Sequence, residues 1–264
     1  MTLHQSVLTD SATMVRRELR HMRRYPSLTL FIAGAPVVFL LLFVYIFGGT
    51  LGAGLGGVAL GRDAYLAYVV PGILLLTVAS AATGTAISVA MDMTEGIVAR
   101  FRTMAISRAS VLIGHVVGSV VQTSLALAIV MGVALLIGFR PTTGPLSWVA
   151  AAGLLALTTW AITWLSVALG LSTRSVETAS NLPMFLFILL FLGSGFVPTA
   201  TLPDGLRWFA EHQPFTPIIE TLRGLLLGTP IGDSGVIAVA WCVAISLVGF
   251  LWARKLYERD PAHR

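Results

Sequence analysis

Six stretches of the chain are apolar over about 20 residues, and this pattern limits the possible folds more than any other feature. A helix of roughly 20 residues is needed to cross a hydrocarbon layer about 30 Å thick. None of the six stretches holds Lys, Arg, Asp or Glu deep within it. They do not alternate as barrel strands would, and open sheet edges cannot be satisfied in lipid. The sequence therefore predicts an all-α integral membrane protein whose six transmembrane helices lie at about 28–47, 66–90, 111–138, 147–170, 182–200 and 235–253.

The composition agrees with the bilayer as solvent. Apolar residues make up 56% of the chain and charged residues 11%, whereas soluble domains carry about 25% charged residues. The net charge of +5 does not indicate nucleic-acid binding, because the basic residues flank apolar segments and form no continuous stripe. We expect one transmembrane domain over residues 1–264 that keeps its first apolar stretch, since the segment before it is too polar for a signal peptide.

The basic residues predict the orientation. With six spans, residues 1–27, 91–110, 171–181 and 254–264 fall on one side and carry 13 of the 17 Lys and Arg residues, and the other side carries 4. By the positive-inside rule, the basic side faces the cytoplasm. Both termini are therefore predicted to be cytoplasmic, in a multi-pass protein of the plasma membrane.

Two cytoplasmic segments have helical patterns. Residues 11–25 carry five arginines among apolar residues and end at Pro26, which favours an amphipathic helix in the membrane interface. In the segment "MDMTEGIVARFRTMAISR", residues 91–108, Ile97, Phe101 and Met104 recur at helical spacing. Such a helix can dock into a groove of another protein. The alternatives are flanking charge at 11–25 and a plain polar loop at 91–108.

Two stretches resemble a known family. "EGIVARFRTMAISRASVLIGH" is similar to the cytoplasmic segment of type-2 ABC exporter permeases, especially the daunorubicin-resistance-like group. "FLGSGFVPTATLPDGLRWFAEHQPFTPIIETLRGLLLG", residues 191–228, resembles the region between spans five and six of the same family. The resemblance covers nearly the whole chain. It implies short re-entrant external helices between spans five and six and a cytoplasmic coupling helix between spans two and three. The coupling residues that it implies are Glu95, Gly96, Ile97, Arg100, Phe101, Arg102 and Met104.

The energy source is expected in another chain. The phosphate-cradling pattern needs Lys before Ser or Thr, and the only lysine, Lys255, is followed by Leu256. The resemblance implies that two copies of a separate ABC ATPase bind ATP and Mg, and that a second permease subunit, a homodimer partner, completes the pathway. We expect no cofactor, metal site or catalytic residue in this chain. Membrane lipid is a further expected partner, and nucleic acid is not.

Two other classes of protein are less well supported. An ion-coupled secondary transporter usually carries acidic residues near the bilayer midplane, and here the carboxylates fall at span ends or in the external stretch. An intramembrane enzyme needs converging catalytic groups, yet His115 has no His or Asp close to it in sequence. Cys242 is the only cysteine and indicates a lone buried thiol.

Substrate-pathway residues are predicted on the third and fifth spans. Gln122 places an amide in hydrocarbon, where it needs a partner. The family places spans one and five along the pathway, and the fifth span offers Phe185, Leu189, Leu192 and Phe196. Such a surface suits a hydrophobic or amphipathic drug, metabolite or lipid-like cargo, while a polysaccharide or glycolipid is the alternative. Lipid-facing aromatic residues would give the same pattern.

Overall fold

The computed structural model describes residues 26–49, 61–94, 108–173 and 175–258. Over these ranges the chain is helical apart from turns and short connections, which confirms the all-α prediction for the described part. The helices are α2 (Pro26–Leu42), continued by the π-helical turn η1 (Phe43–Phe47), α4 (Arg62–Thr94), α6 (Arg108–Leu136), α7 (Pro145–Ser172), α8 (Val176–Asn181), α9 (Met184–Phe191), the 3-10 turn η2 (Thr199–Thr201), α10 (Asp204–His212), α11 (Phe215–Leu227) and α12 (Ser234–Glu258).

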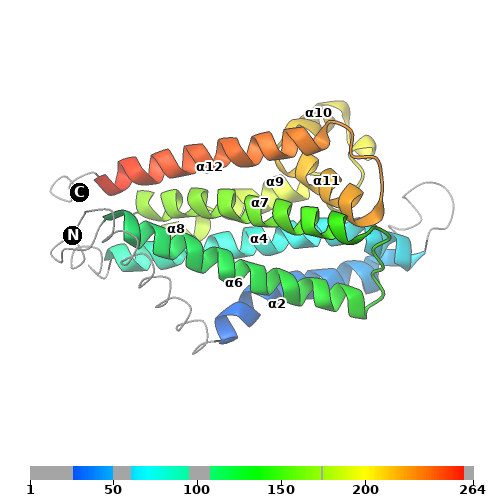
Figure 1. Ribbon diagram of the computed structural model, residues 1–264, viewed down its shortest axis with the longest axis horizontal. Coiled ribbons are helices and arrows are strands. Elements are labelled where there is room, and N and C mark those ends of the chain that lie inside the picture. Colours follow the sequence, from blue (N-terminus) through cyan, green and yellow to red (C-terminus); the bar gives the residue numbers. More distant parts are fainter. Residues whose placement is uncertain (1–25, 50–60, 95–107, 174, 259–264) are drawn as a thin grey trace.

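Four helices are long and apolar enough to cross a membrane: α4, α6 from Ile113, α7 and α12. They contain or closely match the second, third, fourth and sixth predicted spans. The first predicted span corresponds to α2 and η1, which form a shorter apolar helix over Ile32–Phe47. The long helices lie side by side, and Figure 1 shows α10, α11 and the α6–α7 connection at one end of the bundle. The C-terminal ends of α4, α7 and α12 lie at the opposite end, which is the predicted cytoplasmic end.

The fifth predicted span has different bounds in the structure. We expected a helix over 182–200, whereas apolar helix covers Val176–Phe191 and turns follow to Phe196. Ser175 caps the early start, because its hydroxyl accepts a hydrogen bond from the Thr178 amide. The early end coincides with a backbone contact: a Cβ on Gly72 would lie 2.6 Å from the Gly195 carbonyl oxygen. The chain therefore leaves the helix where it passes directly against α4.

The helices α4 and α7 form the centre of the bundle. Both are buried over most of their membrane-spanning windows, whereas only about a quarter of the corresponding windows of α6 and α12 is buried. Glycines allow the close packing on α7: a Cβ on Gly170 would lie 2.6 Å from the Ala86 carbonyl oxygen of α4. A Cβ on Gly249 of α12 would lie 2.7 Å from the Leu165 amide nitrogen. Small residues at helix crossings are the usual means of close packing in a membrane, where the lipid offers no hydrophobic driving force.

Several predicted features fall outside the described residues. The amphipathic helix at 11–25 and the coupling helix with its seven predicted residues lie in segments 1–25 and 95–107. The last six residues of the cytoplasmic tail are also outside the description. Two short helices, α10 and α11, occupy the stretch where short re-entrant external helices were predicted, and residues 213–214 join them. Their external side and re-entrant course stay predictions. The single domain over 1–264 and its orientation stay predictions.

Candidate functional site

Five phenylalanines from α2, η1 and the end of α9 form an aromatic cluster: Phe39, Phe43, Phe47, Phe191 and Phe196. The first three recur every fourth residue, and their neighbouring ring centroids lie 6.3 Å and 5.8 Å apart. Phe196 stacks on Phe43 at 4.9 Å and on Phe191 at 4.7 Å. Phe39 meets the edge of Phe191 at 6.2 Å. These separations match those preferred by aromatic pairs, so the cluster joins the first and fifth apolar helices.

The predicted pathway residues occupy different positions relative to this cluster. Phe196 belongs to it and is 4% exposed, and its place in the turn after α9 brings it against Phe43 of η1. Phe185 is exposed, whereas Leu189 and Leu192 are half-buried. Gln122 is half-buried on α6, which packs on α2, α4 and α7, whereas the main contacts of α9 are with α4 and α11. The structure therefore places Phe196 in the aromatic cluster. Gln122 lies on α6, which contributes no residue to that cluster.

The surface beside the aromatic cluster is apolar and unpartnered in the single chain. Val38, Tyr45 and Ile46 of α2 and η1 are exposed, as are Met184 and Ile188 of α9. A soluble chain seldom exposes such a patch without a binding partner. In a membrane protein the same face can meet lipid, a second subunit or an apolar ligand.

A buried arginine cluster lies at the predicted external end and consists of Arg223, Glu220, Tyr68 and Ser194. Arg223 is 8% exposed, and its guanidinium lies 3.9 Å from the Tyr68 ring centroid. It donates to the Ser194 carbonyl at 2.8 Å and to Glu220 at 2.9 Å. The Tyr68 hydroxyl donates to the same Ser194 carbonyl at 2.9 Å. The cluster therefore connects α11, α4 and the turn after α9.

Sequence analysis missed this cluster. The available signal was an arginine three residues after Glu220 in an otherwise apolar helix, a spacing that favours pairing. The tertiary partners Tyr68 and Ser194 are 155 and 29 residues away from Arg223 in sequence. No local pattern indicates contacts at such separations.

The α10–α11 corner satisfies the polar groups at the end of α9. The Gln213 amide donates to the Leu189 carbonyl at 2.9 Å. The Thr216 hydroxyl accepts from the Ser194 backbone amide at 3.4 Å. Helix ends leave backbone groups without helical partners, and such groups are tolerated at membrane depth only when protein covers them. The corner therefore allows α9 to end early.

At the predicted cytoplasmic end, His115 of α6 pairs with Asp92 of α4. The His115 Nε2 lies 2.9 Å from the Asp92 Oδ2, and the two side chains are 10% and 15% exposed. No His or Asp lies close to His115 along the chain. The packing of α6 against α4 brings His115 and Asp92 together although they are 23 positions apart. A second contact joins the same helices, between the hydroxyls of Thr85 and Ser119 at 2.5 Å.

These two contacts flank the predicted coupling segment. Helix α4 ends at Thr94 and α6 begins at Arg108, so segment 95–107 connects the two helices. Asp92 lies two residues before the end of α4, and His115 lies in the second turn of α6. A force applied to segment 95–107 would reach both α4 and α6, which the His115–Asp92 and Thr85–Ser119 contacts hold together.

The residues of the aromatic cluster, the arginine cluster and the His115–Asp92 pair are suited to binding and to holding helices together. The Asp and Glu side chains within the described ranges lie at helix ends, beside them or on the short helices α10 and α11. Across the same ranges, no group of three His, Cys, Asp or Glu residues is arranged to hold a metal ion. The aromatic cluster and its exposed apolar surroundings offer contacts to an apolar ligand.

Comparison with known proteins gives consistent similarities. A family model described as ABC-2 type transporter matches residues 10–227. The daunorubicin resistance ABC transporter permease protein of Streptomyces coeruleorubidus is 29% identical over 262 residues, which cover 98% of this chain and 89% of that protein. The probable doxorubicin resistance ABC transporter permease protein of Mycobacterium tuberculosis is 25% identical over 205 residues, 76% of this chain and 73% of that protein.

Proposed function

The chain belongs to the ABC-2 type transporter family, and from that premise we propose that it is the membrane-spanning permease subunit of an ATP-driven exporter. It moves a hydrophobic or amphipathic small molecule, such as a drug, a secondary metabolite or a lipid-like compound, out across the plasma membrane. A separate ABC ATPase, present in two copies, binds ATP and Mg and supplies the energy. Both termini of the permease face the cytoplasm.

The aromatic cluster is the observation that carries the choice of cargo. Phe39 and Phe191 are 37% and 43% exposed, so the cluster reaches the surface of the single chain. An aromatic or amphipathic molecule can stack on such rings in the way that the rings stack on one another. The two relatives are described as daunorubicin and doxorubicin resistance permeases, which favours a drug-like cargo here too.

The same exposed face favours a dimer. Apolar residues of α2 and α9 surround the cluster on the outside of the bundle. A second copy of the chain placed against this face would enclose the two clusters between the subunits. The substrate pathway would then run between the copies, with Phe185, Leu189 and Leu192 close to it on the fifth span.

Coupling to the ATPase is assigned to segment 95–107. Ile97, Phe101 and Met104 would dock in a groove of the ATPase, while Arg100 and Arg102 would pair with acidic residues at its rim; Glu95 and Gly96 would begin the segment. The His115–Asp92 pair and the Thr85–Ser119 contact hold α4 to α6. ATP-driven movement of the ATPase would therefore shift these two helices together.

A polysaccharide or glycolipid exporter is the second candidate function. A permease of the same family could pass the lipid anchor of a glycolipid along the apolar face of α2 and α9. An ion-coupled secondary transporter is less well supported, because the described carboxylates lie away from the centres of the long helices.

Recovery of the chain from its native membrane tests the proposal. The full chain is purified in mild detergent, its partners are identified by mass spectrometry, and ATP hydrolysis is measured with and without orthovanadate. The expected result is a stoichiometric ATP-binding subunit with orthovanadate-sensitive activity, and ATP-dependent uptake of daunorubicin by inside-out vesicles. Recovery of the chain alone under several extraction conditions would contradict it, and uptake of a lipid-linked glycan would support the second candidate.

Substitution of Phe101 tests the coupling role. We expect Phe101→Ala to reduce transport at least about tenfold, since loss of one well-packed anchor of about 1.4 kcal/mol or more has this effect on binding. The conservative Phe101→Leu keeps an apolar side chain and should retain most of the transport. Unchanged transport and unchanged ATPase assembly in Phe101→Ala would exclude the docking role.

A further inference from the structure

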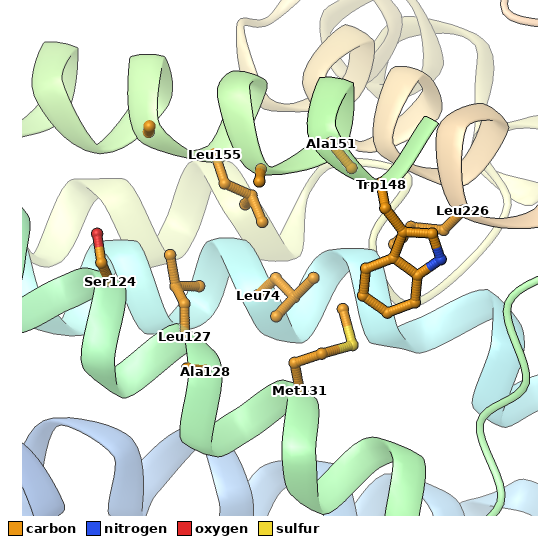
Figure 2. A pocket seen from close by; sticks show the side chains of 11 residues that line it. Leu74, Ser124, Leu127, Ala128, Met131, Trp148, Ala151, Leu155 and Leu226 are labelled. Atoms are coloured by element: carbon orange, nitrogen blue, oxygen red, sulfur yellow. The ribbon is translucent and has the colours of Figure 1, made fainter. Parts of the chain in front are cut away.

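An apolar groove lies between α6 and α7, on helices distinct from those that carry the aromatic cluster. Its volume is about 220 Å³. Leu127, Ala128 and Met131 line it on α6, and residues of α7 from Trp148 to Ala156 line the opposite wall, with Leu74 of α4 and Leu226 of α11 at its base. Figure 2 shows these side chains facing one another across the groove. The groove exists because alanines occupy positions on both walls where larger residues would fill the space.

The groove lies within one half of the bilayer. Its lining on α6 runs from Ser124 to Met131, seven residues or about 10 Å at 1.5 Å per residue. Ser124 lies twelve residues or about 18 Å before the end of α6, and half of a hydrocarbon core is about 15 Å. The groove therefore begins near the bilayer midplane and extends toward the predicted external surface. The Ser124 hydroxyl donates to the Val120 carbonyl at 2.8 Å, so it requires no hydrogen bond from an occupant.

A second hydrogen-bond donor, the Trp148 indole, lies toward the predicted external end of the groove. Figure 2 shows the indole nitrogen of Trp148 on the side of the ring away from Leu74 and Leu127. The connection at 137–144 joins the two walls of the groove, and it is held to the end of α11 because Thr142 donates through its amide to the Leu226 carbonyl at 3.1 Å. This connection carries Arg140, an exposed arginine whose guanidinium donates to the Leu135 carbonyl at 2.7 Å and the Phe139 carbonyl at 3.0 Å.

Arg140 differs from the other arginines on the predicted external side. Arg62 lies 3.9 Å from Asp63, Arg207 pairs with Glu211 at 2.8 Å, and Arg223 pairs with Glu220 at 2.9 Å. Within the described ranges, the structure gives Arg140 no carboxylate partner. Its charge is therefore available to an anion at the membrane surface.

We propose that the groove holds one acyl chain of an anionic phospholipid of the outer leaflet, with the lipid phosphate at Arg140 and an ester oxygen near the Trp148 indole. The acyl chain gains little hydrophobic free energy, since it leaves one apolar environment for another. Its binding rests on dispersion contacts with walls that otherwise have no packing partner and on the charge of the headgroup. This site needs only the predicted orientation in the membrane and does not depend on what the permease exports.

Photo-crosslinking of lipids tests the site. The full chain is placed in nanodiscs that contain phosphatidylglycerol or phosphatidylcholine with a diazirine in the middle of one acyl chain, and cross-linked residues are mapped by mass spectrometry. We expect labelling concentrated on the groove walls and about fivefold stronger with phosphatidylglycerol, the factor that corresponds to about 1 kcal/mol for one basic residue at an anionic surface.

Three variants separate the parts of the proposal. Ala152→Phe fills the groove and should abolish its labelling, whereas Ala150→Phe, on an exposed position of α7 outside the groove, should not. Arg140→Gln should remove the preference for phosphatidylglycerol while labelling by phosphatidylcholine continues.

Three labelling results would contradict parts of the proposed lipid site. Labelling spread evenly over the exposed faces of α6 and α12 would mean bulk lipid only and would overturn the site. Equal groove labelling by both lipids in the unmodified chain would overturn the role of Arg140. Displacement of the label by daunorubicin at low lipid occupancy would assign the groove to cargo instead.

Discussion

Two regions of the molecule are both apolar but pack differently. One is the axis formed by α4, α7 and α12, and the other is the face formed by α2 and α9. Along the axis, glycines bring the backbones of neighbouring helices into direct contact, and α4 and α7 are buried over most of their membrane-spanning windows. On the face, phenylalanines pack ring against ring, and Phe39, Phe47 and Phe191 stay exposed at the surface. The comparison teaches that hydropathy identifies spans, whereas residue size decides which spans form the scaffold and which present a binding surface.

The largest effect is expected where a side chain would enter the backbone contact of the axis. Gly170→Leu forces a side chain against the Ala86 carbonyl and the Val89 side chain. Overpacking costs about 1–3 kcal/mol, and this site lies at the upper end because the contact at 2.6 Å is with backbone, which cannot move aside as a flexible side chain would. We expect little folded protein, measured by size-exclusion chromatography and thermal unfolding in detergent. Gly153→Leu on the same helix meets nothing within 4 Å and should fold normally. Equal yields of the two variants would refute the packing argument.

The next largest effect is expected from the arginine cluster, which joins the axis to the end of α9. Arg223→Gln removes charged hydrogen bonds and the contact with the Tyr68 ring, and a buried hydrogen bond to a charged group contributes about 1.5–3 kcal/mol. We expect a loss of about 2 kcal/mol in the free energy of unfolding, measured by denaturant titration. Arg207→Gln breaks an exposed pair of similar geometry and should leave stability unchanged, as surface pairs usually do.

A smaller structural effect and a larger functional one are expected on the face. Phe191→Ala removes an exposed ring that stacks on Phe196, and aromatic pairs contribute about 0.5–1.5 kcal/mol. Transport of an aromatic drug should fall several-fold while the fold persists. Leu247→Ala, on the exposed side of α12, serves as the control. If both variants transport equally, the aromatic cluster does not contact the cargo.

The smallest effect on folding is expected from His115→Ala. The pair with Asp92 is 10% and 15% exposed, and the Thr85–Ser119 contact still joins the same helices in the variant. The free energy of unfolding should therefore fall by about 1 kcal/mol, the net contribution of one typical hydrogen bond. The ratio of substrate transported to ATP hydrolysed should nevertheless fall, since α4 and α6 would no longer move together. His212→Ala, on the exposed external helix α10, is the matched control. A ratio that stays unchanged would show that the Thr85–Ser119 contact suffices.

Sequence reasoning was strongest where a property is local. Four predicted spans lie within long helices whose ends differ by a few residues, because uninterrupted apolar sequence leaves helix as the main solution in lipid. The fifth span was misplaced at both ends. Its start depends on the Ser175 cap, and its end depends on a contact between Gly72 and Gly195 that only the folded chain brings together.

For the functional sites too, local residue patterns could be predicted from the sequence, whereas contacts between distant residues could not. Phe196 was proposed from its place on an aromatic span, and it does lie in the aromatic cluster. Its partner Phe43 comes from another helix, so the pairing itself could not be inferred. Asp92 and His115 were each visible as charged or polar residues near span ends. What the sequence could not supply was their distance, which the crossing of α4 and α6 sets.

The short fifth span has a consequence for the surrounding bilayer. Helix α4, with 33 residues, extends about 50 Å, whereas the apolar helix over Val176–Phe191 extends about 24 Å. The hydrocarbon layer is about 30 Å thick, and a mismatch is relieved by tilt or by local thinning at a cost of fractions of a kcal/mol per Å. Helix α12, whose window is only 22% buried, has 25 residues and extends about 38 Å. Lipids beside α9 must therefore accommodate a lower apolar wall than lipids beside α12. A change in membrane thickness therefore alters the hydrophobic mismatch differently on the two sides of the molecule. The mismatch is largest on the side that carries the aromatic cluster.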